Sequence, residues 1–182
     1  MNPFKKILKK IIGRKNIFDI LLENGLVCGD NFFMNRGCLI DFSHCWLIKI
    51  GNDVTLAPNV TILAHDASTK KHLGYTKIAK VTIGNNVFIG AGSLILPGVK
   101  IGDNVIIGAG SIVTKDVPSD SVALGSPSKV ISKTKEYVES NKNKIHKENT
   151  FSDEYTLKGR INEEKKIEML RKIDKYGMCF VE

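Results

Sequence analysis

The chain has 182 residues, and 42% of them are hydrophobic, which is enough for one domain with a real core and terminal appendages. Its 27 basic and 19 acidic residues give a formal net charge of +8, which suits an anionic ligand without distinguishing nucleic acid, membrane or a phosphorylated cofactor. Four cysteines without a Cys-x-x-Cys pair argue against a structural zinc site and a disulfide framework, and no apolar run is long enough to cross a bilayer.

Residues 1–26 are predicted to contain a basic amphipathic helix. Apolar side chains recur at helical spacing from Phe4 to Ile12, and lysines occupy the other faces. The segment has no continuous apolar stretch and no small-residue cleavage site, so we expect a cytoplasmic protein rather than a secreted one. The helix could cap the open end of a β-solenoid, which we prefer, or contact anionic lipid at the inner membrane surface.

Residues 27–131 follow a six-residue repeat, clearest from position 83 onward in IGNNVF, IGAGSL, ILPGVK, IGDNVI and IGAGSI. Each short strand can point one aliphatic side chain inward, and Gly, Asn and Asp supply the backbone conformations that a sharp corner needs. Three such sides close a triangular coil, and stacked coils pair every strand with the strands above and below. The repeat therefore predicts an all-β fold, a parallel β-helix.

Two segments break the repeat, and a third follows it. Residues 39–49 lose the six-residue phase, which predicts a short bulge. Residues 64–80 are polar and are predicted to leave the solenoid as a long loop, where functional residues are frequent. Residues 132–182 are predicted to form a polar tail with a surface helix near 162–176, beginning after Asn162 and ending before Gly177.

The repeat region resembles the hexapeptide-repeat O-acetyltransferases, in particular the maltose, galactoside and xenobiotic acetyltransferase group and the enzymes that acetylate surface polysaccharides. The resemblance is carried by NFFMN, IGNDVTLAPNVTILAHD, VTIGNNVFIGAGSLILPGVKIGDNVIIGAGSIVTKDVP and ALGSPSKVI. It covers somewhat more than half of the chain. It implies a left-handed coil, acetyl-CoA as co-substrate, and a homotrimer with active sites between subunits.

The resemblance also implies catalytic residues. His65 directly follows the coil LAPNVTILA and opens the long loop, where this family has its catalytic histidine, so we expect it to be the general base. Asn35 matches the family asparagine that reaches the reaction centre, where its amide could hold the oxyanion or orient the acceptor, although Asn is also common at coil corners. Asp41 falls near the family's sugar-binding acid. Asp66 could orient the imidazole or only shape a turn.

The other histidines are interpreted more simply. His72 lies deeper in the loop and is expected to be a surface residue. His44 lies in the predicted bulge and could approach the acceptor, although a surface imidazole is the plainer interpretation. His146 is expected to be solvated in the tail.

Acetyl-CoA is expected along one side of the prism. Small side chains would let the pantetheine arm lie against the backbone, and lysines could contact the phosphates. The expected residues are Ala91, Ala109, Thr114, Lys115 and Lys129. Family members often have Arg at the position of Lys129 and a second basic residue at that of Ser132, so we expect weaker phosphate binding here, or a contribution from Lys133.

We therefore predict an acetyl-CoA-dependent O-acetyltransferase that acts on a sugar hydroxyl of a small-molecule or glycan acceptor. A capsule or lipopolysaccharide sugar is preferred, because the chain lacks the extended N-terminal helical segment of the maltose and galactoside enzymes. A nucleotide-linked amino sugar or an antibiotic is an alternative acceptor, and a non-catalytic scaffold is an alternative class. A zinc enzyme like the γ-class carbonic anhydrases is disfavoured for want of a third suitable histidine. We expect no metal and no nucleic-acid partner.

Overall fold

The structure, a computed structural model, describes residues 16–182. The chain divides into two compact units, of which the first ends at Thr134 and the second runs from Lys135 to Glu182. The predicted basic helix between Phe4 and Ile12 lies outside the described residues. Within residues 16–182, no helix is both long and apolar enough to span a bilayer.

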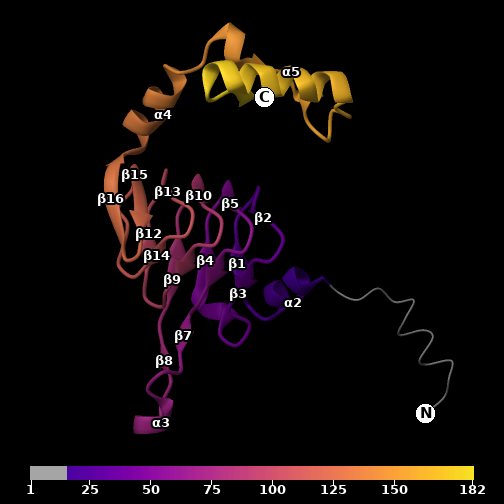
Figure 1. Cartoon of the computed structure of the whole chain (residues 1–182). Coiled ribbons are helices and arrows are strands. Elements are labelled where there is room, and N and C mark those ends of the chain that lie inside the picture. Colours follow the sequence, from indigo (N-terminus) through magenta and orange to yellow (C-terminus); the bar gives the residue numbers. More distant parts are fainter. Residues whose placement is uncertain (1–15) are drawn as a thin grey trace, which may run out of the picture. The chain divides into compact units, whose positions relative to one another are not determined.

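The first unit is a parallel β-helix whose coils have three sides (Figure 1). Side A consists of β1 (Val27–Cys28), β4 (Ile48–Ile50), β9 (Val81–Ile83) and β12 (Lys100–Ile101). Side B consists of β2 (Phe33–Met34), β5 (Val54–Leu56), β10 (Val87–Ile89), β13 (Ile106–Ile107), β15 (Ser121–Gly125) and β16 (Ser128–Lys133). Side C consists of β3 (Leu39–Ile40), β6 (Thr61–Ile62), β11 (Leu94–Ile95) and β14 (Ile112–Val113).

The strand register makes the repeat visible in one column of side B. Phe88 pairs with Ile106, 18 positions later, which is three sides of six residues. Phe33 pairs with Thr55, 22 positions later, so the first coil contains four extra residues. Thr55 pairs with Phe88, 33 positions later, so the second contains fifteen extra residues. Both insertions fall where the sequence loses its phase.

Aliphatic side chains fill the interior of the coils. Each side contributes a column of equivalent residues that are almost fully buried, and burying one such side chain stabilises the fold by about 1.5–3 kcal/mol. These columns are Ile50, Ile83 and Ile101 on side A, Leu56, Ile89 and Ile107 on side B, and Ile62, Ile95 and Val113 on side C. The residues that the repeat predicts to point inward therefore form the core.

Asparagine and aspartate side chains make the corner between sides A and B. Asn86 and Asn104 have φ values of 52° and 56°, in the left-handed region that a sharp corner requires and that Asn tolerates. The Asn86 amide donates to the Asn104 side-chain oxygen at 2.8 Å, and the Asn104 amide donates to Asp120 at 3.0 Å. Stacked coils are therefore also joined by polar side chains outside the core.

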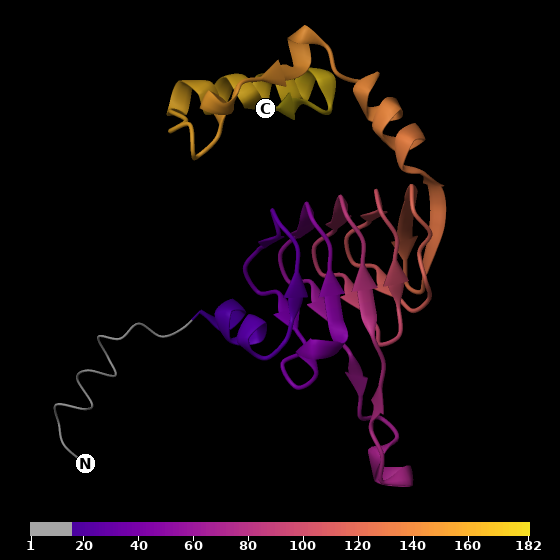
Figure 2. The same cartoon turned by 180° about the vertical axis from the view of Figure 1, so that it is seen from behind.

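The two ends of the solenoid are closed differently. Strand β16 folds back antiparallel to β15 at the last coil. At the first coil lies helix α2 (Ile17–Glu23), which begins after Asn16, whose side chain accepts from the Phe18 N–H (Figure 2). Leu21 of this helix is only 2% exposed, and the Phe18 ring lies 5.4 Å from that of Phe32. Helix α2 thus covers apolar surface of the first coil.

Both insertions leave the solenoid at the corner between sides C and A. The shorter one, residues 41–47, contains the 3₁₀ helix η1 (Cys45–Leu47). The longer one is a hairpin of β7 (His65–Asp66) and β8 (Lys77–Ile78), with the short helix α3 (Lys70–Leu73) at its tip (Figure 1).

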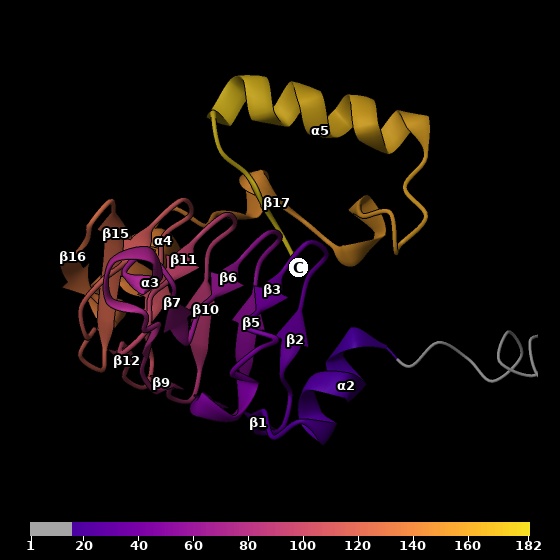
Figure 3. The same cartoon turned by 90° about the horizontal axis from the view of Figure 1, so that it is seen from below.

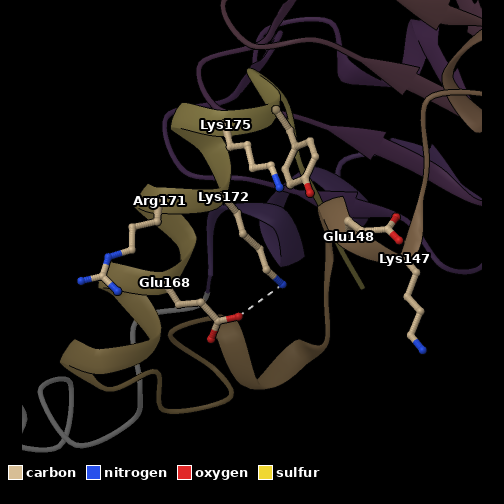
Figure 4. A pocket seen from close by; sticks show the side chains of 7 residues that line it. Lys147, Glu148, Glu168, Arg171, Lys172 and Lys175 are labelled. Carbon is tan, nitrogen blue, oxygen red and sulfur yellow. Dashed lines mark ion pairs between the residues drawn. The ribbon is translucent and has the colours of Figure 1, made fainter.

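The second unit is a small helical assembly, although no regular structure is predicted from the sequence between 133 and 160. Helix α4 (Thr134–Lys142) is followed by η2 (Lys147–Asn149), η3 (Asp153–Tyr155) and α5 (Glu163–Tyr176), and β17 (Thr150–Phe151) pairs with β18 (Phe180–Val181) (Figure 3). The Asn162 side chain caps α5 by accepting from the Lys165 N–H. A polar depression lies between α5 and η2, where Lys172 pairs with Glu168 at 3.2 Å (Figure 4).

Candidate active site

Asp41 and His65 meet at the corner between sides C and A. Asp41 follows β3, and His65 follows β6 one coil later. The Asp41 Oδ2 atom lies 2.5 Å from the His65 Nδ1 atom and also accepts from the Ala64 N–H at 2.9 Å. The Asp41 Oδ1 atom accepts from the N–H groups of Ser43 and His44 at 3.0 and 3.2 Å. Both oxygens of this 2% exposed residue are therefore occupied within the chain.

The Asp41 carboxyl is held in its ionised form. Burial opposes ionisation, but the hydrogen bond to His65 and the bond from the Ala64 N–H outweigh it, so the pKa of Asp41 lies below its usual value. An ionised Asp41 makes His65 Nδ1 the protonated nitrogen. The other nitrogen, Nε2, is then able to accept a proton, and the His65 side chain is 32% exposed.

His44, which the sequence favours as a surface imidazole, lies beside His65. Its ring centroid lies 5.1 Å from that of His65 and 5.3 Å from that of Trp46. Its Nδ1 atom is buried and has no hydrogen-bond partner. The sequence predicts a bulge at 39–49 because the six-residue repeat is interrupted there. Only the folded structure shows that this bulge, which contains His44, lies beside His65.

Asp66 holds the β7–β8 hairpin together and does not contact the His65 imidazole through its ion pair. Asp66 forms an ion pair with Lys77 at 2.5 Å across the hairpin, and the hydrogen bond from Lys77 holds the pKa of Asp66 below its usual range. Asp41 thus holds the imidazole, which is the role that the sequence suggests for Asp66. His72 lies exposed in α3 at the hairpin tip, in agreement with its interpretation as a surface residue.

A groove extends from His65 along the same corner. A depression lined by Leu63, His65 and Ala67 adjoins a second one lined by Ala79 and Thr114. The two depressions share Asp66, Leu96 and Pro97. His65 thus lines the first of these two adjoining depressions and Thr114 lines the second, and the two together are called the groove below.

The other expected site residues lie at more than one corner. Thr114 and Lys115 follow β14 at the corner between sides C and A. Ala91 and Ala109 stack at the corner between sides B and C, where the Gly110 N–H donates to the Ala91 carbonyl at 2.8 Å. Lys129 is exposed on β16. Ala91, Ala109, Thr114 and Lys115 thus border side C from its two opposite edges.

Asn35 is also at the corner between sides B and C. It follows β2, is half-buried, and donates its backbone N–H to the Leu56 carbonyl at 3.0 Å. Asn35 and Asp41 belong to the same coil and are separated by one six-residue side, roughly 15–20 Å of strand. Within a single chain, the Asn35 amide therefore cannot approach the His65 imidazole.

Known proteins share this arrangement of repeats. Residues 80–115 match the family model described as bacterial transferase hexapeptide (six repeats). Protein CapG of Staphylococcus aureus is 40% identical over 173 residues, which cover 92% of this chain and 95% of CapG. The galactoside O-acetyltransferase of Escherichia coli K12 is 43% identical over 106 residues, 57% of this chain and 51% of that enzyme. The chain thus spans about half the length of that relative.

The chain belongs to the hexapeptide-repeat transferases.

It is an acyltransferase of that family. Among solved structures, the hexapeptide-repeat acetyltransferase VCA0836 of Vibrio cholerae O1 biovar eltor, in complex with acetyl coenzyme A, aligns with a TM-score of 0.52. The identity is 25%, and the alignment covers 59% of each chain. Family membership also implies that the coils wind left-handed.

Three side chains at the corner between sides C and A offer ligand atoms for a metal ion. One atom each from Asp41, His44 and His65 lies within 4.8 Å of the others. A carboxylate and two imidazoles are common ligands of zinc, so the expectation that no metal is bound stays a prediction. The sequence has no third suitable histidine, but the carboxylate of Asp41 could take the place of one as a metal ligand.

Proposed function

We propose that the protein is an acetyl-CoA-dependent O-acetyltransferase that transfers acetyl to a sugar hydroxyl. The observation that carries this proposal is the hydrogen bond between the buried Asp41 carboxylate and His65, at the end of the groove that reaches Thr114. A sugar hydroxyl is a weak nucleophile at neutral pH, so a positioned base contributes strongly to its attack. The galactoside O-acetyltransferase relative supports a sugar acceptor.

The reaction proceeds by direct transfer. His65 Nε2 removes the hydroxyl proton while the oxygen attacks the thioester carbonyl carbon. A backbone N–H and the Asn35 amide stabilise the oxyanion of the tetrahedral intermediate. The C–S bond then breaks, and the imidazolium returns the proton to the departing CoA sulfur. No acyl-enzyme forms, and the ionised Asp41 stabilises the transient positive charge of His65.

Asp41 is proposed as the positioning residue of His65. Sequence comparison with the family suggested that it binds the sugar, but its burial and its four hydrogen-bonding partners within the chain favour orientation of the imidazole. A carboxylate that holds one ring nitrogen protonated keeps the other available as a base. Asp41 thus acts on the acceptor through His65.

The donor is proposed to lie in the groove between His65 and Thr114. Exposed Lys115 continues this edge, and its ammonium group can contact a CoA phosphate; Lys129 would contribute from β16. The acetyl coenzyme A bound to the Vibrio cholerae acetyltransferase supports this choice of donor.

The catalytic unit is proposed to be a homotrimer. Its support is the separation of the site residues: Asp41, His65 and Thr114 lie at one corner, and Asn35, Ala91 and Ala109 lie at another. A cyclic trimer that places one corner of each chain against the other corner of its neighbour would bring both sets together three times. The pantetheine arm could then lie between the two corners.

The acceptor is proposed to be a sugar of a surface polysaccharide, in capsule or lipopolysaccharide, acetylated in the cytoplasm. The groove beside His65 is open along the corner, which suits a unit of a larger glycan as well as a free sugar. We do not propose a membrane contact for residues 1–15 or a nucleic-acid partner, because no described residue supports either.

A metal-dependent activity is the second candidate, favoured by the cluster of Asp41, His44 and His65. The two functions exclude each other, because a cation on His65 Nδ1 would displace the bond to Asp41, and a cation on Nε2 would occupy the nitrogen proposed as the base. Dialysis against a chelator, followed by metal analysis and an acetyl-transfer assay, distinguishes them. Unchanged turnover without metal supports the proposed mechanism, whereas loss of activity that zinc restores supports the metal enzyme.

The acceptor class is tested with acetyl-CoA and a panel of acceptors. The panel contains methyl pyranosides, capsule and lipopolysaccharide fragments, a nucleotide-linked amino sugar and an aminoglycoside. Release of free thiol together with an acetyl mass gain on a sugar hydroxyl is the expected result. Acetylation of an amine only would contradict the proposed function, and light scattering of the same sample checks the trimer.

A further inference from the structure

We propose that the 41–47 bulge is the acceptor platform, on which Trp46 stacks against the ring of a pyranose whose hydroxyl faces His65. This inference rests on the proposed sugar acetyltransferase. The bulge connects β3 to β4 and carries the extra residues of the first coil, and the regular coil from Phe88 to Ile106 pairs in the same way without them.

The bulge presents two aromatic rings to solvent next to the base. Trp46 is 56% exposed and Phe42 57% exposed. The His44 ring neighbours both Trp46 and His65, with ring centroids 5.3 and 5.1 Å away. The centroids of the exposed indole and of the His65 imidazole are therefore no more than 10.4 Å apart. A pyranose ring that stacks on the indole would bring its substituents into the neighbourhood of His65.

The bulge is fixed rather than loose. The Asp41 carboxylate accepts from the Ser43 and His44 N–H groups at its beginning. Cys45 is fully buried, and its Sγ atom lies 3.4 Å from the Asn24 carbonyl oxygen. At its end, the Leu47 N–H donates to the His44 carbonyl at 3.0 Å.

Gly25 provides the close support beneath Trp46. Its φ is +98°, and a Cβ atom at this position would lie 3.0 Å from the Trp46 Cβ atom. The backbone and Cβ of Trp46 are therefore packed against the turn after α2, while the residue stays 56% exposed. A preorganised aromatic surface binds with little loss of conformational entropy.

The chemistry of the platform fits a sugar better than a charged ligand. An indole face attracts the polarised C–H bonds of a pyranose and excludes water from one side of the ring, while the hydroxyl groups at the edge remain available for hydrogen bonds. The amphipathic rings of Trp46 and His44, together with the Asp41-bound His65, thus combine an apolar face with a base.

Intrinsic fluorescence tests the platform without requiring turnover, because Trp46 is the single tryptophan of the chain. The purified full chain is titrated with methyl pyranosides, and mannitol serves as a control that has hydroxyl groups but no ring. Saturable quenching or a blue shift with a pyranoside and none with mannitol is expected. An emission spectrum that no pyranoside changes would overturn the inference.

Steady-state kinetics with the best pyranoside provides the second test. Trp46→Ala should raise the KM for the acceptor roughly tenfold and leave the KM for acetyl-CoA unchanged, and Trp46→Phe should restore most of the affinity. Phe88→Ala, which removes an exposed ring on β10, is the matched control and should change neither constant.

The outcomes separate the two proposals. If the wild type acetylates a pyranoside and Trp46→Ala keeps its acceptor KM, the platform is refuted and the proposed function stands. If Trp46→Ala dissociates the oligomer in light scattering, the ring belongs to a contact between copies and the platform is also refuted. If the wild type binds pyranosides with a fluorescence change but acetylates only amines, the proposed function fails and the platform stands.

Discussion

Two corners of the same solenoid are formed by the same repeat but differ in their insertions and in their side chains. The corner between sides B and C is regular: small residues such as Ala91 and Ala109 stack there, and no residue is inserted. The corner between sides C and A carries both insertions and the Asp41–His65 pair. We therefore expect the regular corner to offer a smooth surface for a ligand or a neighbouring chain, and the insertions at the other corner to carry the chemistry.

The largest effect is expected from removing the base at the irregular corner. His65→Ala should lower kcat by ~10²–10⁴-fold, because the acceptor hydroxyl loses its proton acceptor. Binding of acetyl-CoA, measured by calorimetry, should survive because the groove remains. His72→Ala, at the exposed hairpin tip, should keep most of its activity. If these two variants exchanged phenotypes, the base would lie in the hairpin and not at the corner.

A mixing experiment tests whether the two corners cooperate across subunits. Asn35→Ala should lower kcat by ~10²–10³-fold through loss of an oxyanion donor. When His65→Ala and Asn35→Ala chains are refolded together, about one site in four of a cyclic trimer would combine an intact His65 with an intact Asn35 of the neighbour, so roughly a quarter of the wild-type activity should return. Activity that stays at the level of the separate variants would place each site within one chain.

Asp41→Asn should lower kcat by ~10²-fold, at the lower end of the range for a base, because the imidazole remains but loses its orientation. The native pKa of Asp41 is lowered from 3.8, so its ionised form contributes stability above that value and loses the contribution as the pH falls through the native pKa. Urea unfolding should therefore show the full stability difference between wild type and variant above about pH 5, and a shrinking difference below pH 4. A difference that grows on acidification would contradict this assignment.

The smallest effect is expected at the far end of the groove. Lys115→Ala should raise the KM for acetyl-CoA by about fivefold and change kcat little, because an exposed ionic contact contributes modestly. The KM of the wild type should rise with salt more steeply than that of the variant. Initial rates at two ionic strengths measure both effects, and an identical KM in both proteins would place the phosphates elsewhere.

The sequence predicts the regular part of the molecule well and the irregular part only in outline. The phase of the hexapeptides predicts the columns of Ile50, Ile83 and Ile101, and both phase breaks correspond to insertions. What the breaks bring together depends on coil stacking, since Asp41 and His65 are distant in sequence but adjacent after one turn. The sequence therefore assigns Asp41 a role only through its likeness to the family, and it gives no sign that His44 lies beside His65.

In the second unit, local sequence signals identify the caps of α5 but not its surroundings. Asn162 and Gly177 act within one helical turn and are visible in the sequence. The pairing of β17 with β18 and the burial of Phe151, 5% exposed, depend on segments far apart in the chain, and strands of two residues are too short to show a periodic pattern.

The hairpin at 64–80 has a consequence for how such enzymes could diversify. Thr55 pairs with Phe88 in the same register as Phe88 with Ile106, although the first interval contains fifteen additional residues. The corner thus accommodates additional residues without a change of strand register, and the entropic cost of lengthening a loop grows only slowly with its length. A hairpin tip of different sequence, between Asp66 and Lys77, could be grafted while His65 keeps its place beside Asp41.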